Sequence, residues 1–292
     1  MFDNVLVGVD GNAYGRDAIA LAAQLAGADG KLTLANVRLG ELHPLHAITP
    51  GLLDEERDES LALLERERAE VGVQAKLVSV VASSPGAGLH RQAEAQGADV
   101  LVVGSSSRSV FGRAMLGDDT RAALNGAPCA VAIAARAYSA HPSPIAKVGV
   151  AYNGSPESKH ALAVALEVAQ PTKATVSAME VVAVPAYAFT GVMAPPMGET
   201  IELLLADAKA RMSELPGVEG RAAYGLAGEE LAEFGEDVDL LVVGSRGYGP
   251  LRRLVLGSTS EYLERHARCS LLVLPRVVEE GTSAQQAGAD AA

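Results

Sequence analysis

Hydrophobic residues occur along the chain in short unbroken runs, and longer segments with one apolar face separate these runs. Two of the runs read VLVVG (100–104) and LLVVG (240–244). Unbroken apolar runs of this length are typical of parallel strands that are covered on both faces. In the segments between them, apolar residues recur every three or four positions, which indicates amphipathic helices. The alternation of strand and helix predicts right-handed crossovers and therefore an α/β fold with doubly wound parallel sheets.

The same series of elements is expected in each half of the chain. In the first half, the pattern predicts strands at 3–9, 31–38, 74–82, 98–103 and 128–134, and helices at 14–27, 52–71, 86–97 and 113–126. In the second half, it predicts strands at 146–152, 174–182, 219–226, 238–243 and 269–274, and helices at 156–169, 199–214, 228–235 and 251–267. Each half therefore supplies the strands of one five-stranded sheet.

The two halves are also related in sequence. Residues 99–133 align without a gap on residues 239–273. Three landmark pairs in this alignment lie 140 residues apart: Gly104 and Gly244, Gly117 and Gly257, Cys129 and Cys269. The starts of the halves match as well, with Asp10 opposite Asn153. Several landmarks in one order at one spacing indicate a tandem duplication.

The pattern breaks at two places. Prolines and short polar residues interrupt it at 136–145, which predicts a linker between a first unit at 1–137 and a second at 146–276. The final segment, 277–292, has no apolar periodicity and is expected to be disordered.

Composition and charge narrow the function classes. Aromatic residues make up 4% of the chain and Trp is absent, so the core must be aliphatic. A formal net charge of −12 argues against nucleic acid and anionic membranes as main partners. Two cysteines are too few for a disulfide framework and fit a reducing compartment. No apolar run approaches the ~18 residues of a spanning helix and no leader pattern opens the sequence, so the expectation is a cytoplasmic protein.

The candidate chemistry lies at the carboxyl ends of strands, where open α/β sheets bind ligands. In the second half, Gly244 and Gly247 follow the fourth strand, and nine residues later come Gly257, Ser258, Thr259 and Ser260. Glycines let the backbone approach a phosphate closely, and backbone amides at a turn or helix start bind anions without basic side chains. The alternative is that these glycines only make tight turns.

Other polar residues carry weaker signals. Arg246, Arg252 and Arg253 are placed either to reach phosphates or simply to be solvated. His43 and His46 lack a third ligand nearby, so no metal site is expected. No Walker loop, dinucleotide-binding fingerprint or nucleophile elbow is present, and no catalytic residue is assigned.

The spacing G-x2-G-x9-G-S after a hydrophobic fourth strand resembles the nucleotide loop of the universal stress protein family. The resemblance covers roughly 1–135 and 146–275, as in tandem members of that family. It implies a fold like that of the adenine nucleotide α-hydrolases, and it implies ATP, with or without Mg²⁺, as the ligand. It assigns a nucleotide site in the second unit to the following residues: Asn153, Val181, Val243, Gly244, Arg246, Gly247, Gly257, Ser258, Thr259 and Ser260.

The matching positions of the first unit are Asp10, Gly104 and Gly117, but its loop departs from the family pattern. Ser107 replaces the second glycine, and Asp118 replaces the serine that would face a phosphate. A carboxylate about 4 Å from a phosphate costs roughly 4 kcal/mol at an effective dielectric near 20. The second unit, in turn, has Asn153 where the family has an acid. The expectation is a protein that binds ATP mainly in the second unit and responds to stress. Two alternatives stay open: an interaction protein of the same fold without nucleotide, and a slow ATPase.

The resemblance also bears on assembly. Single-unit relatives commonly pair through the final strand, here AVAIA (130–134) and LLVLP (271–275). An uncovered apolar edge strand is an aggregation hazard, and a linker of about ten residues favours pairing within one chain. The two units are therefore expected to pack as a pseudo-dimer, and a further homodimer of the whole chain is left open.

Overall fold

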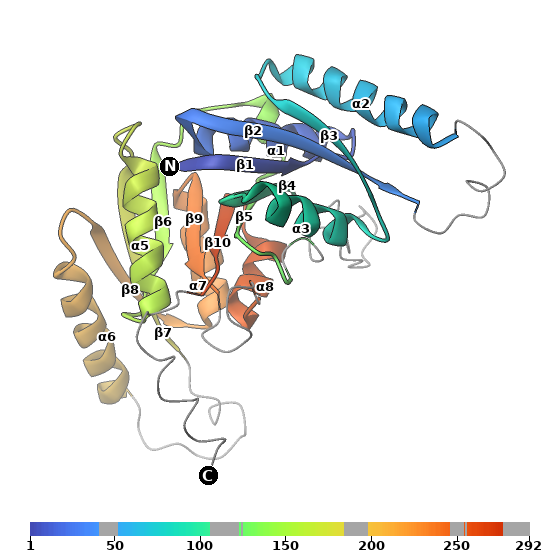
Figure 1. Cartoon of the computed structure of the whole chain (residues 1–292). Coiled ribbons are helices and arrows are strands. Elements are labelled where there is room, and N and C mark those ends of the chain that lie inside the picture. The colour runs from blue at the N-terminus through green and yellow to red at the C-terminus, as the bar shows by residue number, and fades with distance from the viewer. Residues whose placement is uncertain are drawn as a thin grey trace, which may run out of the picture.

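The fold is a single twisted sheet with helices on both faces (Figure 1). A computed structural model describes residues 1–40, 52–105, 123, 125–183, 198–245, 254 and 256–276. The first half contains β1 (Phe2–Gly8), α1 (Ala13–Leu25), β2 (Ala26–Leu39), α2 (Leu52–Val71), β3 (Lys76–Ala82), α3 (Pro85–Gln96), β4 (Val100–Gly104) and β5 (Ala130–Ala134). The second contains β6 (Lys147–Ala151), α5 (Pro156–Ala169), β7 (Thr175–Ala183), α6 (Gly198–Ser213), β8 (Glu219–Gly225), α7 (Ala227–Phe234), β9 (Leu240–Gly244), α8 (Ser258–His266) and β10 (Ser270–Leu274). The expected α/β alternation is confirmed.

All ten strands belong to one sheet, in the order β3-β2-β1-β4-β5-β10-β9-β6-β7-β8. Each half repeats the same internal order, and its strands are parallel to one another. The halves join through β5 and β10, which pair antiparallel with Ala132 opposite Leu272. The two five-stranded parallel sheets that the sequence predicted are joined into one ten-stranded sheet, because the final strands bond directly to each other.

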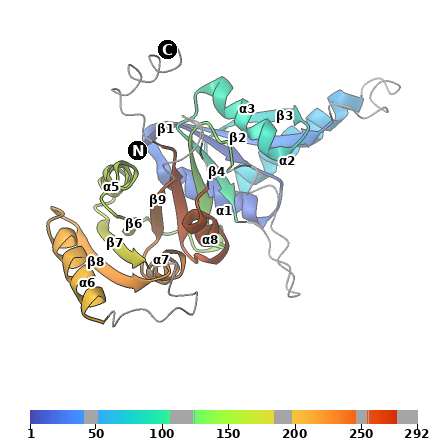
Figure 2. The ribbon, with the colours of Figure 1, turned by 90° about the horizontal axis from the view of Figure 1, so that it is seen from below.

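Side chains alternate between the two faces of the sheet, and helices cover both. Val5 and Val7 point to a core cluster that includes α1, α2, α5 and α6, whereas Leu6 points to a cluster with α3, α7 and α8. Both clusters contain residues of both halves, so the apolar core is continuous across the β5–β10 junction. Figure 2 shows the helices on either side of the sheet from below.

An aspartate in the same place of each half fixes the start of the first strand. Asp99 Oδ2 accepts hydrogen bonds from the N–H groups of Asp3 (3.0 Å) and Asn4 (2.8 Å). Asp239 Oδ2 does the same for Ala146 (2.8 Å) and Lys147 (2.9 Å). The duplication therefore preserves local hydrogen bonding as well as the order of elements.

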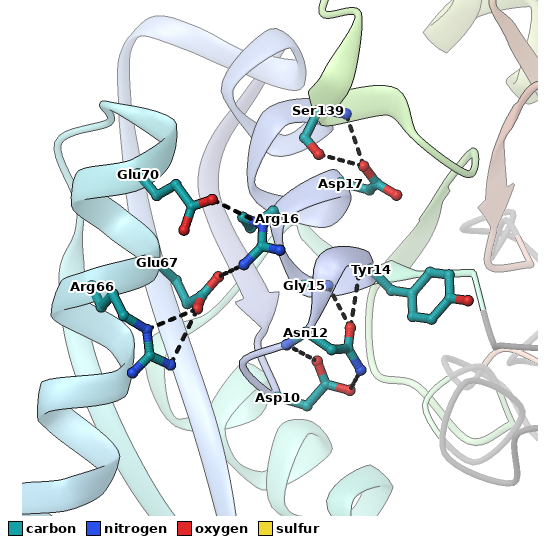
Figure 3. Close-up of polar contacts among 10 residues, drawn as sticks. All are labelled: Asp10, Asn12, Tyr14, Gly15, Arg16, Asp17, Arg66, Glu67, Glu70 and Ser139. Carbon is teal, nitrogen blue, oxygen red and sulfur yellow. Dashed lines mark hydrogen bonds and ion pairs between the residues drawn. The ribbon is translucent and has the colours of Figure 1, made fainter.

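The segment between the halves is ordered by a buried acid. The carboxylate of Asp17 on α1, only 1% exposed, accepts hydrogen bonds from Ala137 N (2.9 Å), Ser139 N (2.8 Å) and Ser139 Oγ (2.6 Å). These bonds hold a 3₁₀ turn at Tyr138–Ala140 against α1 (Figure 3). The linker predicted at 136–145 thus contains a fixed turn.

Two boundaries differ from the sequence prediction by five residues or more. β2 begins at Ala26, five residues early, because Ala26 pairs with Phe2 before the register shifts and Lys31 pairs with Asn4. The last helix begins at Ser258 instead of 251, and Leu254 outside it bonds to the backbone of Ala127 in the first half. Of the helix predicted at 113–126, the segment 113–122 lies outside the described residues, as does the tail 277–292.

Within the described ranges, every helix is too short or too polar to cross a bilayer.

Candidate functional site

The turn that follows the first strand has the same construction in both repeats. Asp10-Gly11-Asn12 leads into α1, and Asn153-Gly154-Ser155 leads into α5. The glycines have φ values of +80° and +78°, which other residues rarely adopt. Asn12 caps α1 by accepting from Tyr14 N (2.8 Å) and Gly15 N (3.2 Å), and Ser155 caps α5 by accepting from Ser158 N (3.2 Å). These caps fix where the two helices start beside the sheet.

The glycine that ends the fourth strand lies directly beneath the start of that helix. A Cβ on Gly104 would overlap the carbonyl oxygen of Tyr14, and one on Gly244 would lie 2.9 Å from Glu157 Cβ. Close packing of helix on strand therefore requires a glycine in each repeat. The first glycine of the loop pattern has this structural role whether or not a ligand binds.

A cavity of about 610 Å³ opens at the carboxyl edge of the second repeat's strands. One part of its wall is apolar and comprises Ala151, Met179, Val181, Ala227, Leu231 and Val243. The other part is polar and comprises Asn153, Ser155, Glu157, Ser158, Gly244, Ser245, Gly257, Ser258, Thr259 and Ser260, with Tyr152 beside them. Eight of the ten second-repeat residues predicted from the sequence line this one cavity. The other two, Arg246 and Gly247, lie outside the described residues.

The start of α8 forms the polar end of the cavity. Gly257 is the N-cap residue and supplies no side-chain cap, while its carbonyl accepts from Glu261 N (2.8 Å). N–H groups in the first turn of a helix have no acceptor within the helix and carry partial positive charge. Ser258 is exposed and Ser260 is buried. This end of the cavity is suited to an anion.

A buried serine hydroxyl also lines the cavity. Ser245, 6% exposed, has no hydrogen-bond partner for its Oγ among the described residues. Its N–H donates to Leu274 O (2.9 Å), which fixes the residue at the junction of β9 and β10. The matching Ser105 of the first repeat likewise has a buried Oγ without a partner in the described part of the chain. An unsatisfied buried hydroxyl costs free energy, so a ligand that bonds to it would gain from satisfying it.

Glu157 introduces a negative charge into the same cavity. Its carboxylate lies 3.9 Å from Arg276 Nε, and its side chain is 17% exposed. The first repeat has Tyr14 at the place of Glu157, and there Arg136 lies 5.9 Å above the tyrosine ring. The same two positions therefore form an ion pair in one repeat and a cation–π contact in the other.

In the first repeat, the predicted acid is held by its own turn. Asp10 Oδ2 accepts from Asn12 Nδ2 at 2.6 Å, and Asp10 Oδ1 from Asn12 N at 3.4 Å (Figure 3). Gly104 lies where the alignment puts it, under α1. Gly117, Ser107 and Asp118 fall outside the described residues, so the loop of this repeat stays a sequence-based prediction.

The other candidates from the sequence are histidines, arginines and cysteines. His43, His46, Arg252 and Arg253 also lie outside the described residues. In the part of the chain that the structure describes, no three His, Cys, Asp or Glu side chains gather to hold a metal ion. Both cysteines are free thiols, and burial raises the pKa of each to about 12.

Sequence reasoning missed several residues of the cavity wall. Ser245 occupies an unspecified position between two glycines of the loop pattern, although its match with Ser105 across the repeats is a readable signal. Glu157 and Leu231 lie on helices, and nothing local in the sequence shows that these helices face the loop.

A comparison with protein families identifies the same two repeats. The model of the universal stress protein family matches the chain twice, over residues 1–135 and 144–275. The chain belongs to the universal stress protein family.

Curated members of that family show the same relationship. Universal stress protein Rv2005c of Mycobacterium tuberculosis is 31% identical over 187 residues, which cover 60% of this chain and 61% of that protein. Universal stress protein Mb2028c of Mycobacterium bovis matches to the same extent. The aligned part thus spans less than two thirds of the length of these universal stress proteins.

Solved structures support the fold over nearly the whole chain. A universal stress protein from Archaeoglobus fulgidus superposes with a TM-score of 0.67 at 18% identity, covering 94% of this chain and 99% of that one. Protein PA1789 of Pseudomonas aeruginosa, described as functionally unknown, superposes with a TM-score of 0.65 at 19% identity, covering 94% and 92%.

Proposed function

We propose that this universal stress protein binds ATP in the cavity of its second repeat and acts as a nucleotide-responsive protein in the stress response. The observation that carries the proposal is the cavity itself, because it unites the strand-end residue Asn153 with Gly244, Gly257 and Ser258. Ligand pockets typically combine apolar walls with a few convergent polar groups, and this cavity has both.

The two parts of the wall suit the two parts of a nucleotide. Met179, Val181 and Leu231 offer an apolar surface for the adenine base. At the other end, the glycines and the start of α8 offer backbone N–H groups for phosphates, and Ser245 adds a hydroxyl that needs a partner. Asn153 Oδ1 accepts from Ser155 N at 3.1 Å, so its side-chain amide is oriented by the turn and is available to the sugar.

The first repeat binds ATP weakly or not at all in this proposal. Asp118 carries a negative charge where a serine would face the phosphates, and Ser107 replaces a glycine. Asp10 is already engaged by Asn12. One nucleotide per chain is the expected stoichiometry.

Turnover is expected to be negligible, so the nucleotide is sensed and not consumed. Phosphoryl transfer needs a positioned nucleophile and usually a metal that bridges the phosphates. Among the described residues of the cavity, Glu157 is the one acid, and Arg276 lies beside it. Mg²⁺, if it accompanies ATP, would be held mainly by the phosphates.

The two free cysteines fit a reducing compartment, and we propose the cytoplasm. The antiparallel contact of β5 with β10 supports an intramolecular pair of repeats, as proposed from the final strands.

Calorimetric titration with ATP tests the site. The wild type is expected to bind one equivalent, and Gly257→Asp to lose binding, because a carboxylate would face the phosphates. The matched control is Gly117→Asp, which puts the same charge at the same place of the first repeat and should leave the titration unchanged. Undiminished binding in Gly257→Asp would disprove the assignment to the second repeat. Absorbance and mass of whatever purified protein releases on denaturation identify the natural ligand independently.

The alternative is an interaction protein that binds no nucleotide. Asn153 in place of an acid is the observation in its favour. A wild type that releases no adenine compound and gives no heat with ATP would favour that alternative.

A further inference from the structure

The segment that leads into the polar end of the cavity is bonded to the other repeat. Leu254 N donates to Ala127 O at 2.9 Å, and Gly126 N donates to Leu254 O at 2.9 Å. Leu256 N donates to Asn125 Oδ1 at 3.4 Å. These three bonds form a short ladder between repeats, and it ends one residue before Gly257.

The side chain of Leu254 anchors this ladder. It is fully buried, in the same core cluster as Ala123, Ala127 and Leu263. Ala123 and Ala127 belong to the first repeat, whereas Leu263 belongs to α8 of the second. The leucine therefore joins the first repeat to the helix whose start lines the cavity.

The first-repeat side of the ladder is itself held in place. His90 Nε2 on α3 lies 2.8 Å from Ala123 O, and Ala127 is buried. Gly126 has a φ of +88°, a backbone conformation that side chains disfavour. In this conformation its N–H reaches the carbonyl of Leu254.

From these contacts we infer that the first repeat is the positioning element of the second repeat's nucleotide site. Residues 125–127 set the position of Leu254 and Leu256, and through them the position of Gly257 and Ser258, which line the cavity. The first repeat therefore contributes to binding although its own loop has lost the family pattern. The expected effect on ATP affinity rests on the proposed function. The claim that the first repeat holds Leu254 and Leu256 in place rests on the hydrogen bonds of the ladder alone.

Gly126→Ala in the full chain tests the inference. Among the described residues, a Cβ there would come within 4 Å only of the His90 ring, at 3.7 Å, so the change acts through backbone conformation and not through a clash. ATP affinity measured by calorimetry is expected to fall about tenfold, the scale of coupling between distant parts of a protein. Gly97→Ala is the matched control, because Gly97 also has a positive φ, of +61°. In the part of the chain that the structure describes, no atom lies within 4 Å of its missing Cβ, and its N–H bonds to carbonyls of α3 in the first repeat. The ATP affinity of the Gly97→Ala variant is expected to stay within about twofold of the wild-type affinity.

Hydrogen exchange separates the inference from the proposed function. The amides of Leu254 and Leu256 are expected to be protected in the wild type without nucleotide, and to exchange faster in Gly126→Ala but not in Gly97→Ala. Unprotected amides in the wild type would overturn the inference even if ATP binds. Faster exchange with unchanged ATP affinity would overturn it as well. A wild type that gives no heat with ATP refutes the proposed function, and the exchange result then still decides whether the first repeat holds the segment.

Asn125→Ala provides a second variant if Gly126→Ala does not fold. It removes the acceptor of the Leu256 N–H, on an exposed side chain. A smaller loss of affinity, about twofold to threefold, with faster exchange at Leu256, is the expected result for one weak hydrogen bond. Unchanged affinity and unchanged exchange would contradict the inference.

Discussion

At the scale of single residues, comparing matched positions in the two repeats distinguishes a residue's role in ligand binding from its role in the fold. Ser105 and Ser245 both have a buried hydroxyl without a partner in the described residues, but only Ser245 lines the candidate cavity. A role shared by both serines belongs to the fold, and a role of Ser245 alone belongs to the ligand.

We expect Ser245→Ala to weaken ATP binding by about fivefold, the loss of one net hydrogen bond of about 1 kcal/mol. Ser105→Ala is the control and should leave the affinity unchanged. Neither variant should be less stable than the wild type, because neither hydroxyl has a hydrogen-bond partner within the described part of the protein. Equal affinity losses in the two variants, measured by calorimetry, would show that the effect comes from the fold.

The two thiols predict a loss of stability at alkaline pH. Burial raises the pKa of Cys129 and Cys269 from 9.0 to about 12, so the folded protein keeps them neutral while the unfolded chain ionises. The free energy of unfolding is therefore unaffected below pH 9 and falls as the pH rises from 9 towards 12, by at most about 1.4 kcal/mol per pH unit for a fully buried thiol. Because the pKa of both thiols rises to about 12, the two thiols should contribute similar declines.

Urea unfolding of the Cys129→Ala, Cys269→Ala double variant between pH 8 and 11 measures this effect. The decline above pH 9 should be shallower than in the wild type. Tyr138, whose pKa burial and Asp239 raise to about 12, adds its own decline above pH 10, so Tyr138→Phe is the companion control. A double variant with the same pH profile as the wild type would contradict thiol burial as the cause of the decline.

At the scale of elements, one glycine in each repeat decides how closely a helix approaches a strand. The sequence alone leaves two interpretations of the loop glycines, a phosphate-binding turn or only a tight turn. The structure adds a packing role for Gly104 and Gly244, since α1 and α5 start directly above them. This explains why Gly104 is present in a repeat whose loop is otherwise altered.

Alanine at these glycines should destabilise the repeats unequally. At Gly104 the new methyl would overlap the carbonyl oxygen of Tyr14 and lie 2.6 Å from its carbonyl carbon, and α1 would have to move to admit it. At Gly244 the nearest atom is a side-chain carbon at 2.9 Å, and backbone atoms begin at 3.2 Å. We expect Gly104→Ala to cost about 3 kcal/mol and Gly244→Ala about 1 kcal/mol in urea unfolding. A larger loss at Gly244 would show that the distances to Glu157 underestimate its packing.

Some of the helices and strands could be predicted from the sequence, and others could not. Unbroken apolar runs and the repeat predicted the strands and their alternation with helices, because those signals are local. The start of α8 could not be predicted, because Leu254 belongs to a stretch with helical periodicity but its N–H bonds to Ala127 in the other repeat. Eight of the seventeen residues that line the candidate cavity were predicted through the family resemblance, whereas Glu157 and Leu231 reach it only through packing between elements.

At the scale of the whole molecule, the two repeats form one structural unit. Both core clusters cross the β5–β10 junction, and Ala135 N donates to Ser270 Oγ at 3.2 Å across it. The pairing of Ala132 with Leu272 leaves neither of these apolar strands at an edge of the sheet.

Separate expression of residues 1–140 and 143–292 tests this unity. Each half would expose its final apolar strand, so we expect the halves to self-associate when alone and to recombine when mixed, as seen by analytical ultracentrifugation. The full chain should unfold in one transition, with equal calorimetric and van't Hoff enthalpies. Two well-behaved monomeric halves that ignore each other would show that the repeats are independent.

Because β5 and β10 are antiparallel, the strands of the two repeats end at opposite sides of the sheet. Because each half-sheet is parallel within itself, the carboxyl ends of β4 and β9 lie at opposite edges of the sheet. A symmetric pair would have the same loop sequence after both strands, whereas here the family's loop pattern follows β9 and an altered sequence follows β4. With ATP bound only in the second repeat, as proposed, the molecule has one nucleotide site, at one side of the sheet.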